Sequence, residues 1–283
     1  QINSAANLIS SPGSSTAPWV ERGPNNVGGR TRAILVDPND ATKKTIWAAG
    51  VDGGLWKTTD ITVASPNWAT TNDFFANMAI SCMAFDSTNN DTMYFGTGEA
   101  WYNLDAVRGF GVWRTTDKGV TWSQLSSTTG SSFNYVTKIV VHPTNHKVYI
   151  STRNGIYVSS NAGNTFTNIG YTGKTVSDIE LSSSGRIHIG IGDAFTTREY
   201  HYTDNDTTWD PIATNFNTVV TAGKRVELDV APNNSSIVYA LVGTSGAIQG
   251  IYKSSNGGVT WAATGAASWV DQACASTSSD FTR

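Results

Sequence analysis

The stretch Thr115-Thr116-Asp117-Lys118-Gly119-Val120-Thr121-Trp122 decides the fold of this chain, because copies of it recur along the sequence. Its clearest copies are Ser254–Trp261 and Ser159–Phe166, whereas Tyr202–Trp209 is degenerate. In a fifth copy, Thr58-Thr59-Asp60, an insertion delays the final aromatic to Trp68. The shared pattern is Ser/Thr-x-Asp/Asn-x-Gly-x-Thr-Trp/Phe.

This pattern predicts a hairpin turn for three physical reasons. Asp or Asn folds its side chain onto the backbone just ahead, and Gly accepts a positive φ. The final aromatic packs beneath the strands that the turn joins. We therefore expect structural roles, rather than catalysis or metal binding, at the key positions of the turns: Asp60, Asp117, Gly119, Trp122, Asn161, Gly163, Phe166, Asp204, Trp209, Asn256, Gly258 and Trp261.

The spacing of the turns predicts the architecture. Their final aromatics stand at positions 68, 122, 166, 209 and 261, and an apolar strand precedes each turn. Repetition at roughly 40–50 residues with several short strands per unit is typical of a β-propeller. We expect an all-β chain of four-stranded antiparallel blades at approximately 19–76, 77–134, 135–175, 176–224 and 225–266.

The ends of the chain do not complete such a ring. Residues 1–18 read as an N-terminal extension, and 267–283 as a linker or the start of a following blade. About five blades are expected to form an incomplete part of a larger ring, with an apolar flank of the fifth blade left for later blades to cover.

Composition excludes several classes of partner. Only 14% of the residues are charged, the formal net charge is −3, and there is no basic run, which argues against nucleic acid and anionic membrane surfaces. No apolar segment is long enough to span a bilayer. Cys82 lies in an expected inner strand and reads as a buried free thiol, while Cys274 lies in a polar tail. Neither has metal-ligand spacing, and we expect no metal or cofactor.

The repeated turns resemble the Asp-box (BNR) motif of sialidases, xyloglucanases and sortilin-type propellers. Three further stretches, Gly23–Arg32, Val51–Lys57 and Gly96–Glu99 followed by Arg108-Gly109, resemble one narrower group. These are large secreted Asp-box propeller proteins of Bacteroidota, often labelled glycosyl hydrolases. The resemblance implies a secreted or cell-surface protein that meets an extracellular glycan or protein ligand. It also implies further blades and export by the type IX secretion system, whose machinery would be a partner.

Propeller geometry restricts where a ligand site can lie. The repeated turns share one face with the turns that follow the first strands, so loops between second and third strands lie on the opposite face, where ligands usually bind. The longest of these loops runs from Gly96 to Gly109. We predict ligand contacts on it, because acids bind sugar hydroxyls and aromatic rings stack on sugar faces: Glu99, Trp101, Tyr102, Asp105 and Arg108.

Catalytic candidates on this face are weak. Two suitably spaced acids could cleave a glycosidic bond, and Asp52, Glu99 and Asp193 are the candidates, with Asp73 beside Phe74 and Phe75 close by in the sequence. Glu99 could instead pair with Arg108 to brace the loop, with the aromatics packed beneath it.

Three arginines, Arg30, Arg32 and Arg225, begin first strands near the axis. Sialidases clamp a carboxylate with three arginines, but these three could equally tie neighbouring blades together. The other catalytic groups of a sialidase form no compact set in this sequence. Three functions stay open: a propeller that binds a glycan or protein, for example in adhesion; a glycoside hydrolase acting on a polysaccharide; and a scaffold for later domains.

Overall fold

The computed structural model describes residues 30–72, 75–102, 104–244 and 247–264. Asp73, Phe74, Cys274 and the N-terminal extension lie outside this part of the chain. Within it the protein is all-β, as the repeats predict, and its strands form five antiparallel sheets in sequence order. We call these sheets blades 1 to 5.

Each blade is a meander in which successive strands pair. Blade 1 contains β1 (Thr31–Val36), β2 (Ile46–Gly50), β3 (Leu55–Thr58) and β4 (Ala69–Thr70). Blade 2 contains β5 (Ile80–Asp86), β6 (Asn89–Thr97), β7 (Val112–Thr115) and β8 (Ser123–Gln124). Blade 3 contains β9 (Val136–Val141), β10 (Val148–Thr152), β11 (Gly155–Ser159) and β12 (Thr167–Gly170).

Blade 5 has the same four-strand order, with β16 (Arg225–Val230), β17 (Val238–Thr244), β18 (Ala247–Ser254) and β19 (Ala262–Ala263). Blade 4 contains only β13 (Val176–Leu181), β14 (Ile187–Ile191) and β15 (Glu199–Thr203). A single bridge between Thr203 and Trp209 replaces its fourth strand. Pro211 follows at once and has no backbone N–H to donate, so the chain leaves the sheet there.

The described chain contains one α-helical turn, α1 (Phe216–Val219), and short 3₁₀ turns at Ser126–Thr128 and Ser131–Phe133. None of these helices could cross a membrane.

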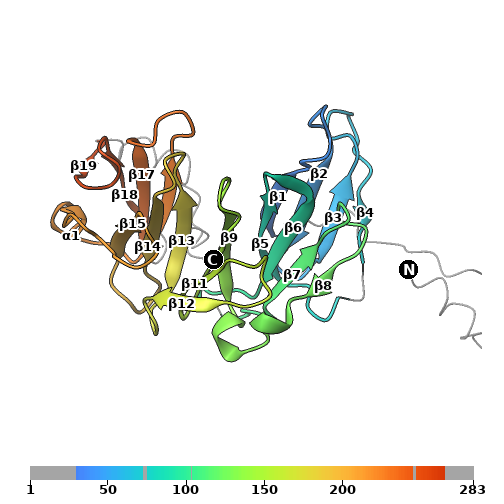
Figure 1. Ribbon diagram of the computed structural model, residues 1–283, viewed down its shortest axis with the longest axis horizontal. Coiled ribbons are helices and arrows are strands. Elements are labelled where there is room, and N and C mark those ends of the chain that lie inside the picture. Colours follow the sequence, from blue (N-terminus) through green and yellow to red (C-terminus); the bar gives the residue numbers. More distant parts are fainter. Residues whose placement is uncertain (1–29, 73–74, 103, 245–246, 265–283) are drawn as a thin grey trace, which may run out of the picture.

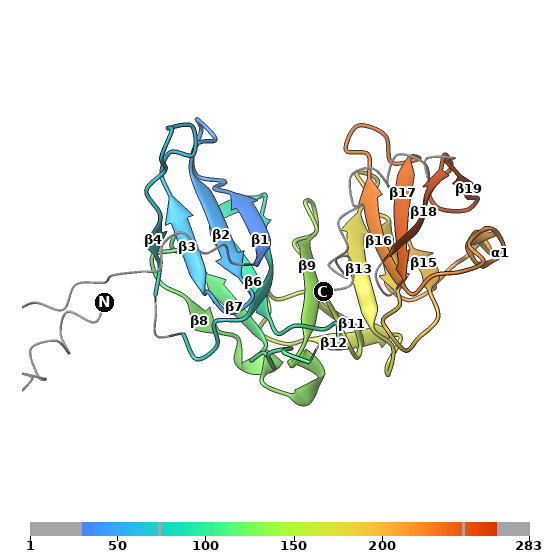
Figure 2. The same ribbon diagram turned by 180° about the vertical axis from the view of Figure 1, so that it is seen from behind.

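The first strands of the blades stand side by side at the centre of the fold. In both views blades 1 and 5 stand at opposite ends of a fan, with β9 between them (Figures 1 and 2). Neighbouring first strands are joined by hydroxyl groups: Ser81, Thr137 and Ser177 each donate to a backbone carbonyl of the next blade's first strand at 2.6 Å. Such bonds hold the blades at close spacing around the axis.

The core is divided among the interfaces between blades. Each of the four interfaces has its own cluster of buried apolar side chains. At each interface one aromatic side chain comes from the segment that links the two blades, and we call these four residues the link aromatics: Phe75, Phe133, Tyr171 and Phe216. The second strands of blades 3 and 4, which lie between neighbouring blades, are therefore covered on both sheet faces.

The repeated turns have the geometry that their composition predicts. Asp117 Oδ1 accepts hydrogen bonds from Thr115 Oγ1 and the Thr121 N–H, at 2.7 and 2.9 Å. Gly119 has a φ of 82°, and a Cβ atom there would lie 2.5 Å from the Trp47 ring of the preceding blade. Asn161 and Asn256 accept the equivalent pairs of bonds in blades 3 and 5.

Blade 4 corrects one expected position. Asn205, not Asp204, caps the degenerate turn: its Oδ1 accepts hydrogen bonds from the backbone N–H groups of Thr207 and Thr208 at 3.1 and 2.8 Å. Asp204 instead binds both Nε and Nη2 of Arg186, at 2.7 and 2.9 Å. The turn is one residue shorter than its copies, so counting back from Trp209 places the acid one position too early.

Candidate functional site

The face opposite the repeated turns carries the loop between β6 and β7, residues 98–111, which we call the β6–β7 loop. Its base is tied down by the Gly109 N–H, which donates to the Asn134 carbonyl at 2.8 Å, and by the Glu99 N–H, which donates to the Val107 carbonyl at 2.9 Å. This loop holds all five residues predicted to contact a ligand.

Glu99 is buried and serves as a brace between blades 1 and 2. Its carboxylate meets Arg30 at 2.9 and 3.1 Å and Arg32 Nη2 at 3.6 Å. Arg108 is exposed and donates to Asn134 Oδ1 at 3.2 Å. The brace expected between Glu99 and Arg108 is therefore made by Glu99 with two arginines of blade 1.

Trp101 lies at the propeller axis, between the first and last described blades. Its ring centroid is 3.4 Å from the guanidinium carbon of Arg225 and 5.9 Å from that of Arg32. Arginine stacks on the indole through a cation–π contact, which holds the half-buried ring in place. Arg225 therefore covers part of the indole that an open stacking platform for a sugar would need.

Tyr102 is half-exposed and reaches toward blade 4. It meets Phe195 edge-on, with ring centroids 4.8 Å apart. The guanidinium of Arg153 lies 3.8 Å from the rings of both Tyr102 and Tyr135. Tyr102 and Phe195 thus form an exposed aromatic pair at the rim of this face.

Asp193 positions the loop that carries Phe195. Its carboxylate is buried, accepts the N–H groups of Phe195 and Thr196 at 2.8 Å each, and is also bound by Thr175 Oγ1 at 2.5 Å. Burial alone would raise the pKa of Asp193, but these hydrogen bonds outweigh it and lower the pKa below its usual range. Every one of these contacts is structural, so Asp193 is a poor proton donor.

Asp52 and Asp105 lie apart from the axis. They line a cavity of about 680 Å³ on blade 1, together with Arg30, Trp56 and Trp68. Asp105 Oδ2 is 3.8 Å from Arg30 Nη2. The structure therefore separates the predicted site residues: Asp52 and Asp105 line the blade 1 cavity, Glu99 and Trp101 lie close to the axis, and Tyr102 lies at the rim.

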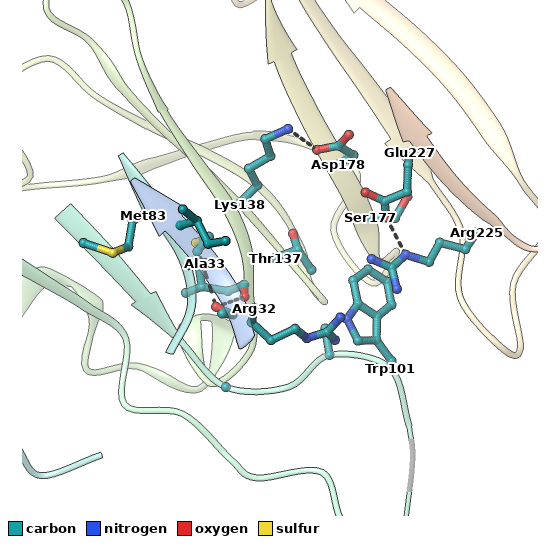
Figure 3. Close-up of a pocket in the computed structure, with 16 residues that line it drawn as sticks. Arg32, Ala33, Met83, Trp101, Thr137, Lys138, Ser177, Asp178, Arg225 and Glu227 are labelled. Atoms are coloured by element: carbon teal, nitrogen blue, oxygen red, sulfur yellow. Dashed lines mark hydrogen bonds and ion pairs between the residues drawn. The ribbon is translucent and has the colours of Figure 1, made fainter. Parts of the chain in front are cut away.

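A second cavity, of about 270 Å³, lies on the axis itself (Figure 3), and we call it the axial pocket. The first strands of all five blades line it, along with Gly98, Ala100 and Trp101 of the β6–β7 loop. Five charged side chains point into it: Arg32, Lys138, Asp178, Arg225 and Glu227.

The charges of the axial pocket are arranged in pairs. Lys138 Nζ lies 2.8 Å from Asp178 Oδ1 and also bonds Glu180, while Arg225 Nε bonds Glu227. Asp178 is buried, and its Oδ2 accepts the Leu228 N–H of blade 5 at 2.7 Å. Burial, reinforced by the negative charge of Asp178, raises the pKa of Glu227 against the opposing effect of Arg225.

Sequence reasoning found Arg32 and Arg225 but missed Lys138, Asp178 and Glu227. The signal was present in the alternation of Arg225-Val226-Glu227-Leu228-Asp229, which points every second side chain, the charged ones, to one sheet face. Strict alternation in a first strand normally means one solvated face. Only the assembled ring shows that this face meets four other strands at the axis.

Groups that could bind a metal ion and the free thiol were located in the part of the chain that is described. No group of three or more His, Cys, Asp or Glu side chains there could hold a metal ion. Cys82 is a buried free thiol whose pKa burial raises to about 11, so it is inert at neutral pH.

Comparison with known proteins places the chain among propellers without assigning a family. No family model matches it. A xyloglucanase from Hypocrea jecorina (strain QM6a) is 26% identical over 192 residues, which is 64% of this chain but 20% of that protein.

Solved structures give the same result for the fold. An ancestral GH74 enzyme superimposes with a TM-score of 0.63 at 19% identity over 79% of this chain and 30% of its own. The Niastella koreensis GH74 enzyme gives 0.53 at 17% identity over 83% and 45% of the two chains. A chain of the nidogen/laminin complex also gives 0.53, at 11% identity over 79% and 74%.

The described chain therefore spans less than half the length of the GH74 enzymes that it resembles. Similar structures include GH74 enzymes and a chain of the nidogen/laminin complex, so the likeness does not choose between their activities. It identifies the fold of this chain as a β-propeller.

Proposed function

We propose that this chain is part of an extracellular propeller that binds a glycan, and that the axial pocket receives one sugar unit. The observation that carries the proposal is the composition of the pocket: an indole wall from Trp101 beside paired charges of both signs. Sugars need donors and acceptors for their hydroxyls and an apolar surface for their C–H faces. The likeness to a xyloglucanase over 192 residues supports the same class of ligand.

The rim of the pocket supports binding of a longer chain. The Tyr102–Phe195 pair is exposed on the same face, and its two rings come from blades 2 and 4. A glycan that enters the axial pocket with one unit would contact this pair with the next. Aromatic side chains combined with a few polar groups that fix the orientation of the ligand are typical of binding sites.

Hydrolysis is the second candidate, and one observation favours it. Asp178 and Glu227 both line the axial pocket, and the raised pKa of Glu227 suits the general acid of a pair of carboxyl groups. The earlier candidates are less suited, since Glu99 is neutralised by Arg30 and Arg32 and Asp193 is fully hydrogen-bonded. Binding remains the first choice because Lys138 and Arg225 already engage the two acids of the pocket.

The test measures binding and cleavage on the same variants. Xyloglucan oligosaccharides would be titrated calorimetrically into the full-length protein, with a glycan array to widen the search. We expect Asp178→Asn and Glu227→Gln to weaken binding at least tenfold, while Asp229→Asn, on the same strand but exposed, leaves it unchanged. Release of reducing sugar that disappears in Glu227→Gln would favour the hydrolase, and binding equal in all variants would exclude the axial pocket.

Location and export rest on the resemblance to secreted propellers of Bacteroidota. We infer that the protein is secreted or displayed on the cell surface through the type IX secretion system. Deletion of a type IX component in the native host should trap the protein inside the cell envelope, and unchanged secretion would contradict this. A scaffold role is the remaining alternative, and it predicts no glycan affinity in any variant.

A further inference from the structure

The cavity of about 680 Å³ on blade 1 lies away from the proposed glycan site, and its lining is unusual. Trp56 and Trp68 both border it, and Trp56 is exposed. Both lie on the blade 1 flank that faces away from blade 2, because Trp56 pairs with Thr70 while Trp47 and Leu55 face the blade 2 core. Blades 2 to 5 show which kind of side chain packs on the equivalent flank.

In blades 2 to 5 the equivalent flank is filled by a link aromatic. Phe75 packs on Trp113 at 5.3 Å between ring centroids, and Phe133 packs on Tyr157 at 4.7 Å and Phe166 at 5.8 Å. The remaining two interfaces repeat the arrangement: Tyr171 meets His201 at 4.7 Å and Trp209 at 5.0 Å, and Phe216 meets Trp261 at 5.2 Å.

The ring partners of the link aromatics come from two fixed positions of a blade: blades 3 and 4 use both, blade 2 uses the first and blade 5 the second. One lies two residues before the Ser or Thr that begins the repeated turn, as Trp113 does before Thr115. The other is the aromatic that ends the turn, such as Trp209. In blade 1 these positions are Trp56, two residues before Thr58, and Trp68. The cavity is therefore bordered by the two rings that accept a link aromatic in the other blades.

The segment that leads into blade 1 offers one aromatic residue. Among residues 1–30 the sequence contains Trp19 and no other Phe, Tyr or Trp. Phe133 and Phe216 stand 3 and 9 residues before the first residues of β9 and β16, and Trp19 stands 12 before Thr31. Arg30 and Thr31 line the cavity, so the chain reaches β1 at its edge. At roughly 3.3 Å per extended residue, Trp19 can reach any part of it.

We propose that Trp19 is the link aromatic of blade 1 and docks in this cavity between Trp56 and Trp68. The acidic lining suits an indole, whose N–H only donates: Asp52 and Asp105 both line the cavity and can accept that bond. Docking would anchor the N-terminal segment on the flank of blade 1. The flank would then bind the N-terminal segment of the same chain rather than a second glycan.

Photo-crosslinking on the full chain tests the contact directly. Trp19 would be replaced by p-benzoylphenylalanine. The variant protein would be irradiated at low concentration, and its crosslinked products would be mapped by mass spectrometry. We expect crosslinks within one molecule to Trp56, Trp68 or Ala48, which all line the cavity. Crosslinks to another copy of the chain, or to the face of the repeated turns, would overturn the proposal.

A double-mutant cycle gives a second readout. Trp19→Ala and Trp68→Ala should each lower the melting temperature by about 2–4 °C, and the double variant should melt close to the lower single variant. Trp19→Phe should restore most of the loss, and Val20→Ala should cause none. Fully additive losses, or a Trp68→Ala variant that loses affinity for xyloglucan oligosaccharides at an unchanged melting temperature, would show that Trp19 does not occupy the cavity.

Discussion

At the scale of single residues, this propeller depends on positions where one atom more would not fit. Gly258 has a φ of 91°, and an added Cβ atom would lie 1.7 Å from the Tyr200 Oη of the preceding blade. In the same turn of blade 3, a Cβ atom added at Gly163 would lie 2.6 Å from Leu125 Cδ1. The glycine of the repeated turn is thus required both by the backbone and by the neighbouring blade.

Gly258→Ala should therefore lower the free energy of unfolding by about 2–4 kcal/mol, the combined cost of overpacking and of a non-glycine residue at positive φ. Gly130→Ala is the matched control, since its φ is −71° and no atom lies within 4 Å of its added Cβ. Urea denaturation measures the free energy of unfolding of both variants. An equal, small effect of the two variants would contradict the packing argument.

Trp101 contributes to stability through its contact with Arg225 of blade 5. Because its ring stacks on Arg225, we expect Trp101→Ala to cost about 1–2 kcal/mol of stability, the value of a desolvated cation–π contact. A double-mutant cycle with Arg225→Gln measures the coupling free energy between Trp101 and Arg225. If the two losses add without coupling, the stack does not stabilise the fold, and Trp101 is free to serve a ligand alone.

At the scale of elements, the interface between two blades is the unit of stability. Blades 4 and 5 meet through Trp261, which is 4% exposed, packs edge-on against Tyr200 at 4.8 Å and donates from Nε1 to the Gly258 carbonyl at 2.8 Å. Trp122 occupies the same position in blade 2 but is only half-buried, against Trp47 and Phe95.

We expect Trp261→Ala to lower the free energy of unfolding by about 3–5 kcal/mol, the usual cost of removing a buried tryptophan. Trp122→Ala should cost clearly less, because less of its surface leaves water on folding. Thermal and chemical denaturation of both variants checks the order. A larger loss from Trp122→Ala would show that burial does not set the strength of these interfaces.

Blade 4 contains a histidine, His201, whose protonation contributes to stability. Burial would lower the pKa of His201, but its bonds to Asp210 and Glu199 outweigh burial and raise the pKa. Lys174, which pairs with Glu199, and the Tyr171 ring also face it.

A raised pKa in the folded state means that the protonated ring contributes stability below about pH 6.5, the ordinary value. That contribution is lost as the pH rises through the folded-state pKa. The stability difference between the native protein and His201→Gln should therefore shrink between pH 6 and pH 9. The midpoints of urea unfolding of both proteins, measured across this pH range, test the prediction. A stability difference that grows with pH would show that folding does not raise the pKa of His201.

At the scale of the whole molecule, apolar side chains are exposed on both end blades of the described chain. Blade 1 exposes Ile34 by 69% and Val36 by 43%, and Tyr239 of blade 5 is exposed by 39% and accepts a cation–π contact from Lys253. Exposed apolar side chains on an end blade promote association.

Residues 1–283 alone should therefore form dimers or larger species as concentration rises, and Ile34→Lys should reduce this. Val120→Lys is the control, because Val120 is 78% exposed but lies on a repeated turn. Light scattering after gel filtration gives the masses. A strictly monomeric native chain at millimolar concentration would contradict the prediction.

Local chemistry determined most of the architecture from sequence alone. The turn signature depends on side chains two to six residues apart, and the recurrence of its aromatics predicted five successive β-blades. The degenerate copy at Asn205 was misplaced by one residue because Asp204 has the same local chemistry. The tertiary structure decided the site. Trp101, Asp178 and Glu227 are far apart in sequence, and they line one pocket because the five first strands and the β6–β7 loop converge at the axis. The burial of Asp178, the ion pairs and the raised pKa of Glu227 therefore depend on neighbours that no local pattern specifies.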